Sequence, residues 1–128
     1  MNKFATTDLV HASKVKAPDG SDVRILLSLS GGGMAHFELP ANQVSHAVVH
    51  QTVEEIWYVI SGYGDMWRKQ DDFESITSLA PGVCLTIPVG TCFQFRASAV
   101  EALCTITITM PPWPGEQEAL FVEGPWKV

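Results

Sequence analysis

The sequence predicts an all-β barrel or sandwich, and three observations carry that prediction. Short runs rich in aromatic and β-branched residues recur along the chain, and turn residues separate them at intervals of about 8–12 residues. No long segment keeps a helical period of apolar residues. The hydrophobic content of 46% against 17% charged residues argues against disorder. A chain of 128 residues fits one domain, which we predict to span 1–128.

The predicted strands are short apolar or alternating runs that end at turn residues. In order they are 23–29, 34–39, 44–50, 55–61, 65–69, 73–79, 83–87, 92–96 and 103–109. Three glycines at 31–33 supply the first turn, since glycine adopts backbone conformations closed to other residues. Pro40 ends the second strand, Gly62 ends the fourth, and Pro81 with Gly82 separates the sixth strand from the seventh.

The chain becomes proline-rich after Met110. Prolines cannot donate the hydrogen bonds of a strand ladder, so an extended path is expected here. Phe121 and Trp126 then alternate with charged residues. We predict a barrel core at about 23–110 and a C-terminal strap at 111–128 that packs its aromatic rings on the outside. The alternative is a proline-rich ligand for a partner.

Composition excludes several classes of partner. The net charge is −6, and no basic cluster is longer than Arg68 with Lys69, so no nucleic-acid partner is expected. No stretch approaches the roughly 20 apolar residues of a membrane helix, and an acidic surface disfavours anionic membranes. The N-terminus lacks an apolar signal core. Cys84, Cys92 and Cys104 are too few and too irregular for a disulfide framework; Cys84 and Cys104 are predicted to be reduced core residues, and the expected compartment is the cytoplasm.

One segment carries candidate chemistry. His50 is followed five residues later by Glu55, then by an aromatic and aliphatic strand that ends at Gly62. This spacing puts an imidazole and a carboxylate on neighbouring strands, where both can point into a narrow barrel and meet. His and Glu are donors that Fe, Mn, Zn, Ni or Cu sites use.

A second segment follows the same plan without a second histidine. Gly82 precedes a buried strand, and Pro88 and Gly90 form a turn that leads into the next strand. Taken in this order, the two segments resemble the two motifs of the cupin superfamily. His50 and Glu55 with Gly62 match the spacing of the first motif, and Gly82, Pro88 and Gly90 match the second.

The resemblance covers roughly 28–110, and 54–64, 90–96 and 110–119 look like small single-domain bacterial cupins without an assigned reaction. It implies a double-stranded β-helix, which is a jelly-roll-like barrel, with a pocket at one end and often a homodimer. Apolar strands leave unpaired edges that need cover, so we expect the dimer to form through sheet edges.

The chain departs from the cupin metal site, which uses three histidines and one glutamate. The positions of the first and third histidines carry Val48 and Phe93 here, and the asparagine of the second motif is Ala97. Only His50 and Glu55 remain as metal ligands. A stable site for a divalent transition metal normally needs at least three protein ligands. The sequence therefore predicts that such a metal is weakly bound or absent.

Two residues offer a repair of this site. His46 shares the inward parity of the residue at 48, but it reaches a common ion with the residue at 50 only if the strand bulges. Cys92 takes the position of the third histidine only if the preceding turn is one residue shorter. Both repairs stay open at this point.

The candidate pocket residues surround the histidine and the glutamate. Those predicted to line the pocket by inward parity are His46, Val48, Trp57 and Phe93. The nearby carboxylate is expected to hold the proton of the imidazole to higher pH, while desolvation opposes this.

These residues predict a small-molecule-binding barrel of unassigned reaction. In a metal-supported enzyme, His50 and Glu55 are ligands; in a metal-free enzyme, His50 is a general base and Glu55 orients it or acts as an acid. The alternatives are a non-catalytic ligand-binding or regulatory module and a structural subunit that mainly dimerises.

Overall fold

The protein is built from strands, as the sequence predicts. The computed structural model describes residues 3–128, and within them the one helical element is a short 3-10 turn. The elements are β1 (Ser13–Lys16), β2 (Asp22–Leu29), β3 (Gly32–Leu39), β4 (Val48–His50), β5 (Glu54–Ser61), β6 (Gly64–Gln70), β7 (Phe73–Leu79), β8 (Cys84–Ile87), β9 (Cys92–Ala97), β10 (Leu103–Met110), η1 (Glu116–Glu118) and β11 (Ala119–Phe121).

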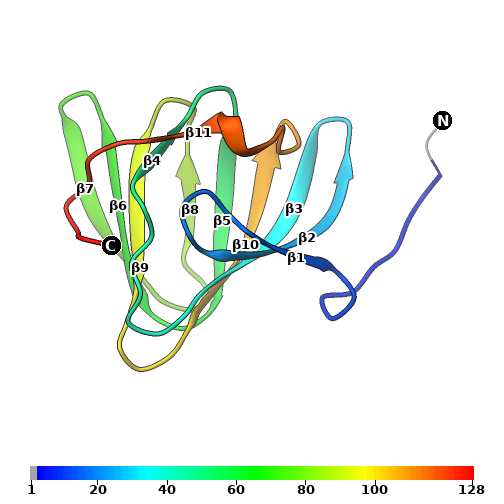
Figure 1. Cartoon of the computed structure of the whole chain (residues 1–128), viewed down its shortest axis with the longest axis horizontal. Coiled ribbons are helices and arrows are strands. Elements are labelled where there is room, and N and C mark those ends of the chain that lie inside the picture. Colours follow the sequence, from blue (N-terminus) through cyan, green and yellow to red (C-terminus); the bar gives the residue numbers. More distant parts are fainter. Residues whose placement is uncertain (1–2) are drawn as a thin grey trace.

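The strands form two antiparallel sheets that face each other (Figure 1). One sheet has six strands in the order β1-β2-β3-β10-β5-β8, and the other has five in the order β11-β4-β9-β6-β7. Strands distant in sequence are neighbours, since β10 pairs with both β3 and β5. This arrangement is a jelly-roll-like barrel, and it confirms the predicted fold class. Among the described residues, no helix is long and apolar enough to cross a membrane.

The core lies between the sheets and follows the period-2 alternation of the strands. In β5, Glu55, Trp57 and Val59 are buried while their neighbours are exposed. The largest fully buried side chains come from both sheets and include Trp57, Phe93, Phe95, Leu39, Met66, Leu79, Ile87 and Leu103. Alternation alone therefore places the residue at 55 on the inner face of the barrel.

The strand predicted at 44–50 is the one that differs most from the observed structure. Only Val48–His50 forms a strand, and residue 44 makes an isolated bridge to Arg96. Ser45 and Ala47 are buried on the irregular segment, and burial then resumes at 48 and 50, so the alternation changes phase between 47 and 48. His46 consequently does not share a face with the residue at 50.

The C-terminal segment packs on the outer face of the five-stranded sheet. Gln94 is 1% exposed; its Nε2 donates to the backbone oxygen of Trp126 at 2.8 Å, and its Oε1 accepts from the Trp126 backbone N–H at 3.1 Å. The Arg96 guanidinium lies 4.2 Å from the centre of the Trp126 ring. Phe121 belongs to β11 and is mostly exposed.

One core prediction is wrong. Cys84 is exposed and Cys104 is only half-buried, and all three cysteines are free. On β8 the buried residues are Leu85 and Ile87, so alternation turns Cys84 outward. A strand with apolar residues on both faces gives no pattern from which to choose the inner face.

Candidate active site

A cavity of about 360 Å³ lies against the inner faces of β2 and β3. Its walls are mostly apolar, and they include Val23, Ile25 and Phe37 from the strands and Trp113 from the segment after β10. The polar residues on its wall are Lys16, Asp19, Ser28, His50, Glu55, Thr109 and Glu116. Apolar walls with a few convergent polar groups are typical of small-molecule sites.

His50 and Glu55 are held at this cavity by a tight connection between β4 and β5. Glu118, from η1, accepts the backbone N–H groups of Thr52 and Val53 at 2.6 and 3.1 Å. The Thr52 hydroxyl donates to the same carboxylate. These bonds satisfy backbone donors that the turn would otherwise bury unpaired. The turn therefore places the last residue of β4 opposite the second residue of β5.

The two predicted site residues meet inside the barrel. His50 is 5% exposed and Glu55 is 2% exposed, and Nδ1 of the histidine lies 3.9 Å from Oε2 of the glutamate. The indole N–H of Trp57 donates to Glu55 Oε1 at 2.9 Å. The imidazole Nδ1 has no hydrogen-bond partner within residues 3–128. One oxygen of the carboxyl group is thus fixed, and the other faces an unpaired imidazole nitrogen.

Burial sets the charge of this pair. The pKa of Glu55 is raised to about 8, mainly by desolvation; the Trp57 hydrogen bond lowers it, and the negative charges of Asp19 and Glu118 add to the rise. Desolvation also lowers the pKa of His50 to about 4. Near neutral pH both groups are therefore uncharged. Trp57 occupies Oε1, so the proton of the acid belongs on Oε2, the oxygen that faces the imidazole.

This result corrects the expected protonation of the histidine. The sequence predicts that the carboxylate keeps His50 protonated, but in the dry site the carboxyl group is itself neutral and offers no negative charge. Aromatic rings account for the desolvation: the imidazole contacts Phe93 edge-on at 5.1 Å and Trp113 at 5.0 Å between ring centres. Desolvation outweighs the attraction of the Glu118 carboxylate, which raises the pKa of the imidazole.

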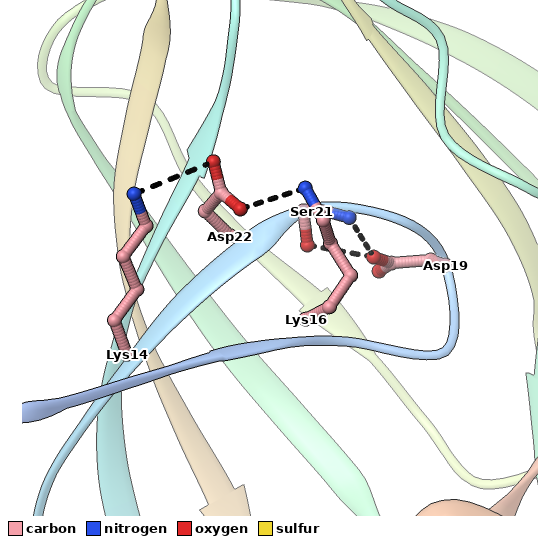
Figure 2. Close-up of polar contacts among 5 residues, drawn as sticks. All are labelled: Lys14, Lys16, Asp19, Ser21 and Asp22. Atoms are coloured by element: carbon pink, nitrogen blue, oxygen red, sulfur yellow. Dashed lines mark hydrogen bonds and ion pairs between the residues drawn. The ribbon is translucent and has the colours of Figure 1, made fainter.

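Asp19 is a third acidic residue that the sequence analysis missed. It lies in the turn between β1 and β2, is 6% exposed, and accepts the backbone N–H and the hydroxyl of Ser21 at 2.9 and 2.6 Å (Figure 2). Its backbone oxygen accepts from the N–H of His46 at 2.7 Å. Burial raises the pKa of Asp19. The Pro-Asp-Gly turn at 18–20 is a sequence signal for the hairpin, but not for its position over the cavity.

Three of the predicted pocket residues do not lie on the cavity wall. His46 stacks on Phe121, with ring centres 5.0 Å apart, because the strand loses its alternation before residue 48. Trp57 and Phe93 are 0% and 1% exposed and belong to the packed core, where their rings meet at 6.2 Å. Val48 lines the cavity together with the histidine and the glutamate.

The residues present do not fit a divalent metal ion. The cupin ligand positions at 48 and 93 carry buried apolar side chains. Nowhere in residues 3–128 do three His, Cys, Asp or Glu side chains gather closely enough to hold an ion. Neither repair helps, because His46 lies against Phe121 and Cys92 points to the face opposite its neighbour Phe93. No step of the chemistry below uses a metal.

Comparison with known proteins places this geometry in a known fold. No protein-family model matches the sequence, and no curated protein matches it. A variant of Streptomyces PAC13 with uridine superimposes with a TM-score of 0.74 at 15% identity, covering 95% of this chain and 92% of that one. Pac13 is a nucleoside dehydratase.

Two further solved structures agree with this match. KdgF from Halomonas sp. has a TM-score of 0.74 at 13% identity, over 88% of this chain and 97% of that one. The capsular polysaccharide assembling protein CapF from Staphylococcus aureus has a TM-score of 0.76 at 17% identity, and the chain spans about a third of its length (88% of this chain, 33% of that one). The protein therefore has the cupin fold, as the motif resemblance predicts.

Proposed function

We propose that the protein is a small-molecule enzyme that moves protons without a metal, in an isomerisation or an elimination. Glu55 is the acid and His50 is the base. The observation that carries this proposal is the geometry of the buried pair: a carboxyl oxygen lies 3.9 Å from an imidazole nitrogen that has no hydrogen-bond partner within residues 3–128, at one end of a small-molecule cavity. Perturbed pKa values of opposite direction in one cleft are typical of acid–base sites.

The geometry supports a pair of proton transfers between the two side chains and a carbonyl compound. His50 Nδ1 takes the proton from the carbon next to the carbonyl group, and the C–H electron pair becomes a C=C bond. The carbonyl oxygen takes the proton of Glu55 Oε2, which gives an enol, a carboxylate and an imidazolium. Return of the imidazolium proton to another carbon, with the enol proton returning to Glu55, completes an isomerisation. In a β-hydroxy carbonyl compound, the imidazolium proton goes instead to the departing hydroxyl, the C–O bond breaks and water leaves. The enol electron pair forms the new C=C bond, the enol proton returns to Glu55 and the carbonyl group re-forms, which completes a dehydration.

Other side chains keep this pair ready. Trp57 occupies one carboxyl oxygen and so directs the acidic proton toward the cavity. Phe93 and Trp113 contact the imidazole and exclude water from it, which keeps it unprotonated and able to accept a proton. The dehydration that Pac13 catalyses belongs to the same class of proton-transfer chemistry, on the same fold.

A non-catalytic ligand-binding module is the second candidate function. It is favoured by one observation: a pKa of about 4 makes His50 a weak base, so proton abstraction at neutral pH has little driving force from this group alone. In that case the acid hydrogen-bonds a ligand without reacting with it.

Hydrogen–deuterium exchange separates these two functions without knowledge of the product. We would incubate a panel of small carbonyl compounds with the protein in D₂O at neutral pD and follow loss of the α-proton signals by NMR. We expect catalysed exchange for some members and at least a hundredfold slower exchange in His50→Gln and Glu55→Gln. His46→Gln and Glu54→Gln are matched controls, because His46 lies off the cavity wall and Glu54 is exposed.

Equal exchange rates in both site variants and the native protein would exclude the proposed chemistry. Binding of a panel member with no exchange above the buffer rate would assign the module instead.

A further inference from the structure

The cavity wall restricts the chemistry of the ligand through its charge. Lys16 is the one lysine or arginine on this wall among residues 3–128, and its ammonium group donates to Asp22 at 2.8 Å (Figure 2). Lys14 lies 3.9 Å from the same aspartate. The acidic wall residues are Asp19, Glu55 and Glu116. An anionic ligand would therefore meet carboxyl groups and no free cation.

Polar side chains of Glu55, His50 and Thr109 converge at one end of the cavity. Thr109 lies directly opposite Glu55 in the strand register and lines the same wall. The imidazole Nδ1 of His50 has no hydrogen-bond partner in the part of the chain that the structure describes. Most of the wall near β2 and β3 is formed by apolar side chains, with Ile25 and Phe37 among them, and Ser28 is its polar exception. A ligand that fits has one polar end and a mostly apolar body, because a polar group placed against this apolar part of the wall would be buried without a partner.

The volume of the cavity limits the size of the ligand. An apolar cavity of roughly 150 Å³ holds one benzene molecule. The cavity here is about 360 Å³, which is large enough for a body of two fused rings. Phe37 and Trp113 supply aromatic surface for such a body.

We propose that the natural ligand is an uncharged, largely apolar carbonyl compound of one or two rings, whose carbonyl oxygen accepts from Glu55 and Thr109 and whose neighbouring carbon lies at His50 Nδ1. This inference rests on the proposed function for the role of the polar end. The charge and size of the ligand follow from the cavity wall alone.

Three probes of similar size test the proposal by isothermal titration calorimetry. They are 1-tetralone, a neutral bicyclic ketone; 1-naphthoate, an anion of similar shape; and uridine, a neutral but highly polar molecule. We expect 1-tetralone to bind at least ten times more tightly than either of the other two. Tighter binding of 1-naphthoate or uridine would overturn the proposal, and so would the absence of 1-tetralone binding at millimolar concentration.

A substitution that fills the cavity tests whether the ketone binds there. Ala35 lines the cavity, and Ala35→Phe is expected to abolish 1-tetralone binding, whereas Ile108→Phe, at an outward position of β10, is expected to leave it unchanged. In the unmodified protein, amide chemical shifts of Phe37, Glu55 and Thr109 should change on titration with the ketone, whether or not the filled variant folds. Shift changes confined to other residues would contradict the proposal.

The two proposals fail separately. Binding of 1-tetralone in this cavity without exchange of any panel compound removes the enzyme and keeps the ligand class. Exchange that depends on His50 and Glu55, together with preferred binding of an anion, removes the ligand class and keeps the enzyme.

Discussion

The barrel interior is filled between β5 and β9 but hollow beside β2 and β3. In the filled part, Trp57, Phe93 and Phe95 are at most 1% exposed and form T-shaped ring pairs. In the hollow part, Ile25 and Leu27 of β2 are 53% and 44% exposed although they face the same interior. Both parts obey the same alternation of inward and outward residues.

The difference arises from what lies opposite each strand. Large side chains from both sheets meet in the filled part, whereas the wall opposite β2 and β3 is formed by Trp113, Glu116 and Ala119 from the C-terminal segment. Close packing stabilises the fold, while the unfilled space lets a ligand reach the buried pair at its border. On the proposed function, stability and ligand binding thus depend on separate parts of one interior.

Truncating a side chain in the filled part is expected to have the largest effect on stability. Phe93→Ala removes a ring that is 1% exposed, and it should lower the free energy of unfolding by about 3–5 kcal/mol. Ile25→Ala, on the cavity wall, should lower it by less than about 1 kcal/mol. Urea denaturation followed by tryptophan fluorescence measures both. Equal losses would show that the two parts are equally packed.

The neutral acid makes stability depend on pH. The pKa of Glu55 rises on folding from 4.5 to about 8, so the folded state binds the extra proton and the free energy of unfolding falls as pH rises between these values. The pKa of His50 falls from 6.5 to about 4, so its contribution rises with pH between 4 and 6.5 and opposes the first effect there.

Between pH 6.5 and 8 the contribution of His50 to stability no longer changes with pH, so only that of Glu55 does. The free energy of unfolding should therefore fall by up to about 1.4 kcal/mol per pH unit in this window. Asp19, whose pKa is also raised, and Glu118, whose pKa is lowered, are the other acidic groups near the pair. Glu55→Gln should flatten the profile in this window, and thermal unfolding at several pH values measures it. A decline that persists unchanged in the variant would point to another group.

A buried hydroxyl gives a smaller effect. Thr107 is 0% exposed, faces the filled part beside Trp57, and its Oγ1 has no partner within residues 3–128. Thr107→Val keeps the shape and removes the unpaired group, so it should stabilise the protein by about 1 kcal/mol. Thr109→Val, at the cavity, is the matched control and should change stability less. A loss of stability at 107 would reveal a bound water there.

Metal removal should have the smallest effect. We expect substoichiometric transition metal in the purified protein, because Val48 and Phe93 occupy two of the cupin ligand positions. Dialysis against EDTA should leave the melting temperature unchanged. Elemental analysis that finds one tightly held ion per chain would contradict the donor set described here.

The sequence predicts local features of this fold well, because strand alternation and turn chemistry are local. Eight of the nine predicted strands match observed strands to within two residues at each end, and Glu55 is inward as its parity requires. The error at His46 has a local cause as well: the segment before β4 is irregular, so parity counted back from residue 50 fails.

The remaining features depend on distant parts of the chain. Glu118 is 66 residues from Thr52, which it holds in place, and no spacing rule connects them. Asp19 reaches the cavity only because the β1–β2 turn lies over it. The protonation of the pair depends on rings at 93 and 113, whose contact with His50 appears only in the folded barrel.

The protonation state of the buried pair is the central claim, and an NMR titration tests it most directly. The side-chain carboxyl carbon of Glu55 and the ring nitrogens of His50 are followed from pH 3.5 to 9 in isotopically labelled protein, with Glu55→Gln and His50→Gln to assign the signals. We predict that the glutamate titrates near pH 8 and that the histidine is neutral at every pH well above 4. A glutamate that titrates near 4.5 beside a histidine that stays protonated above pH 6.5 would make the pair an ion pair and contradict the account.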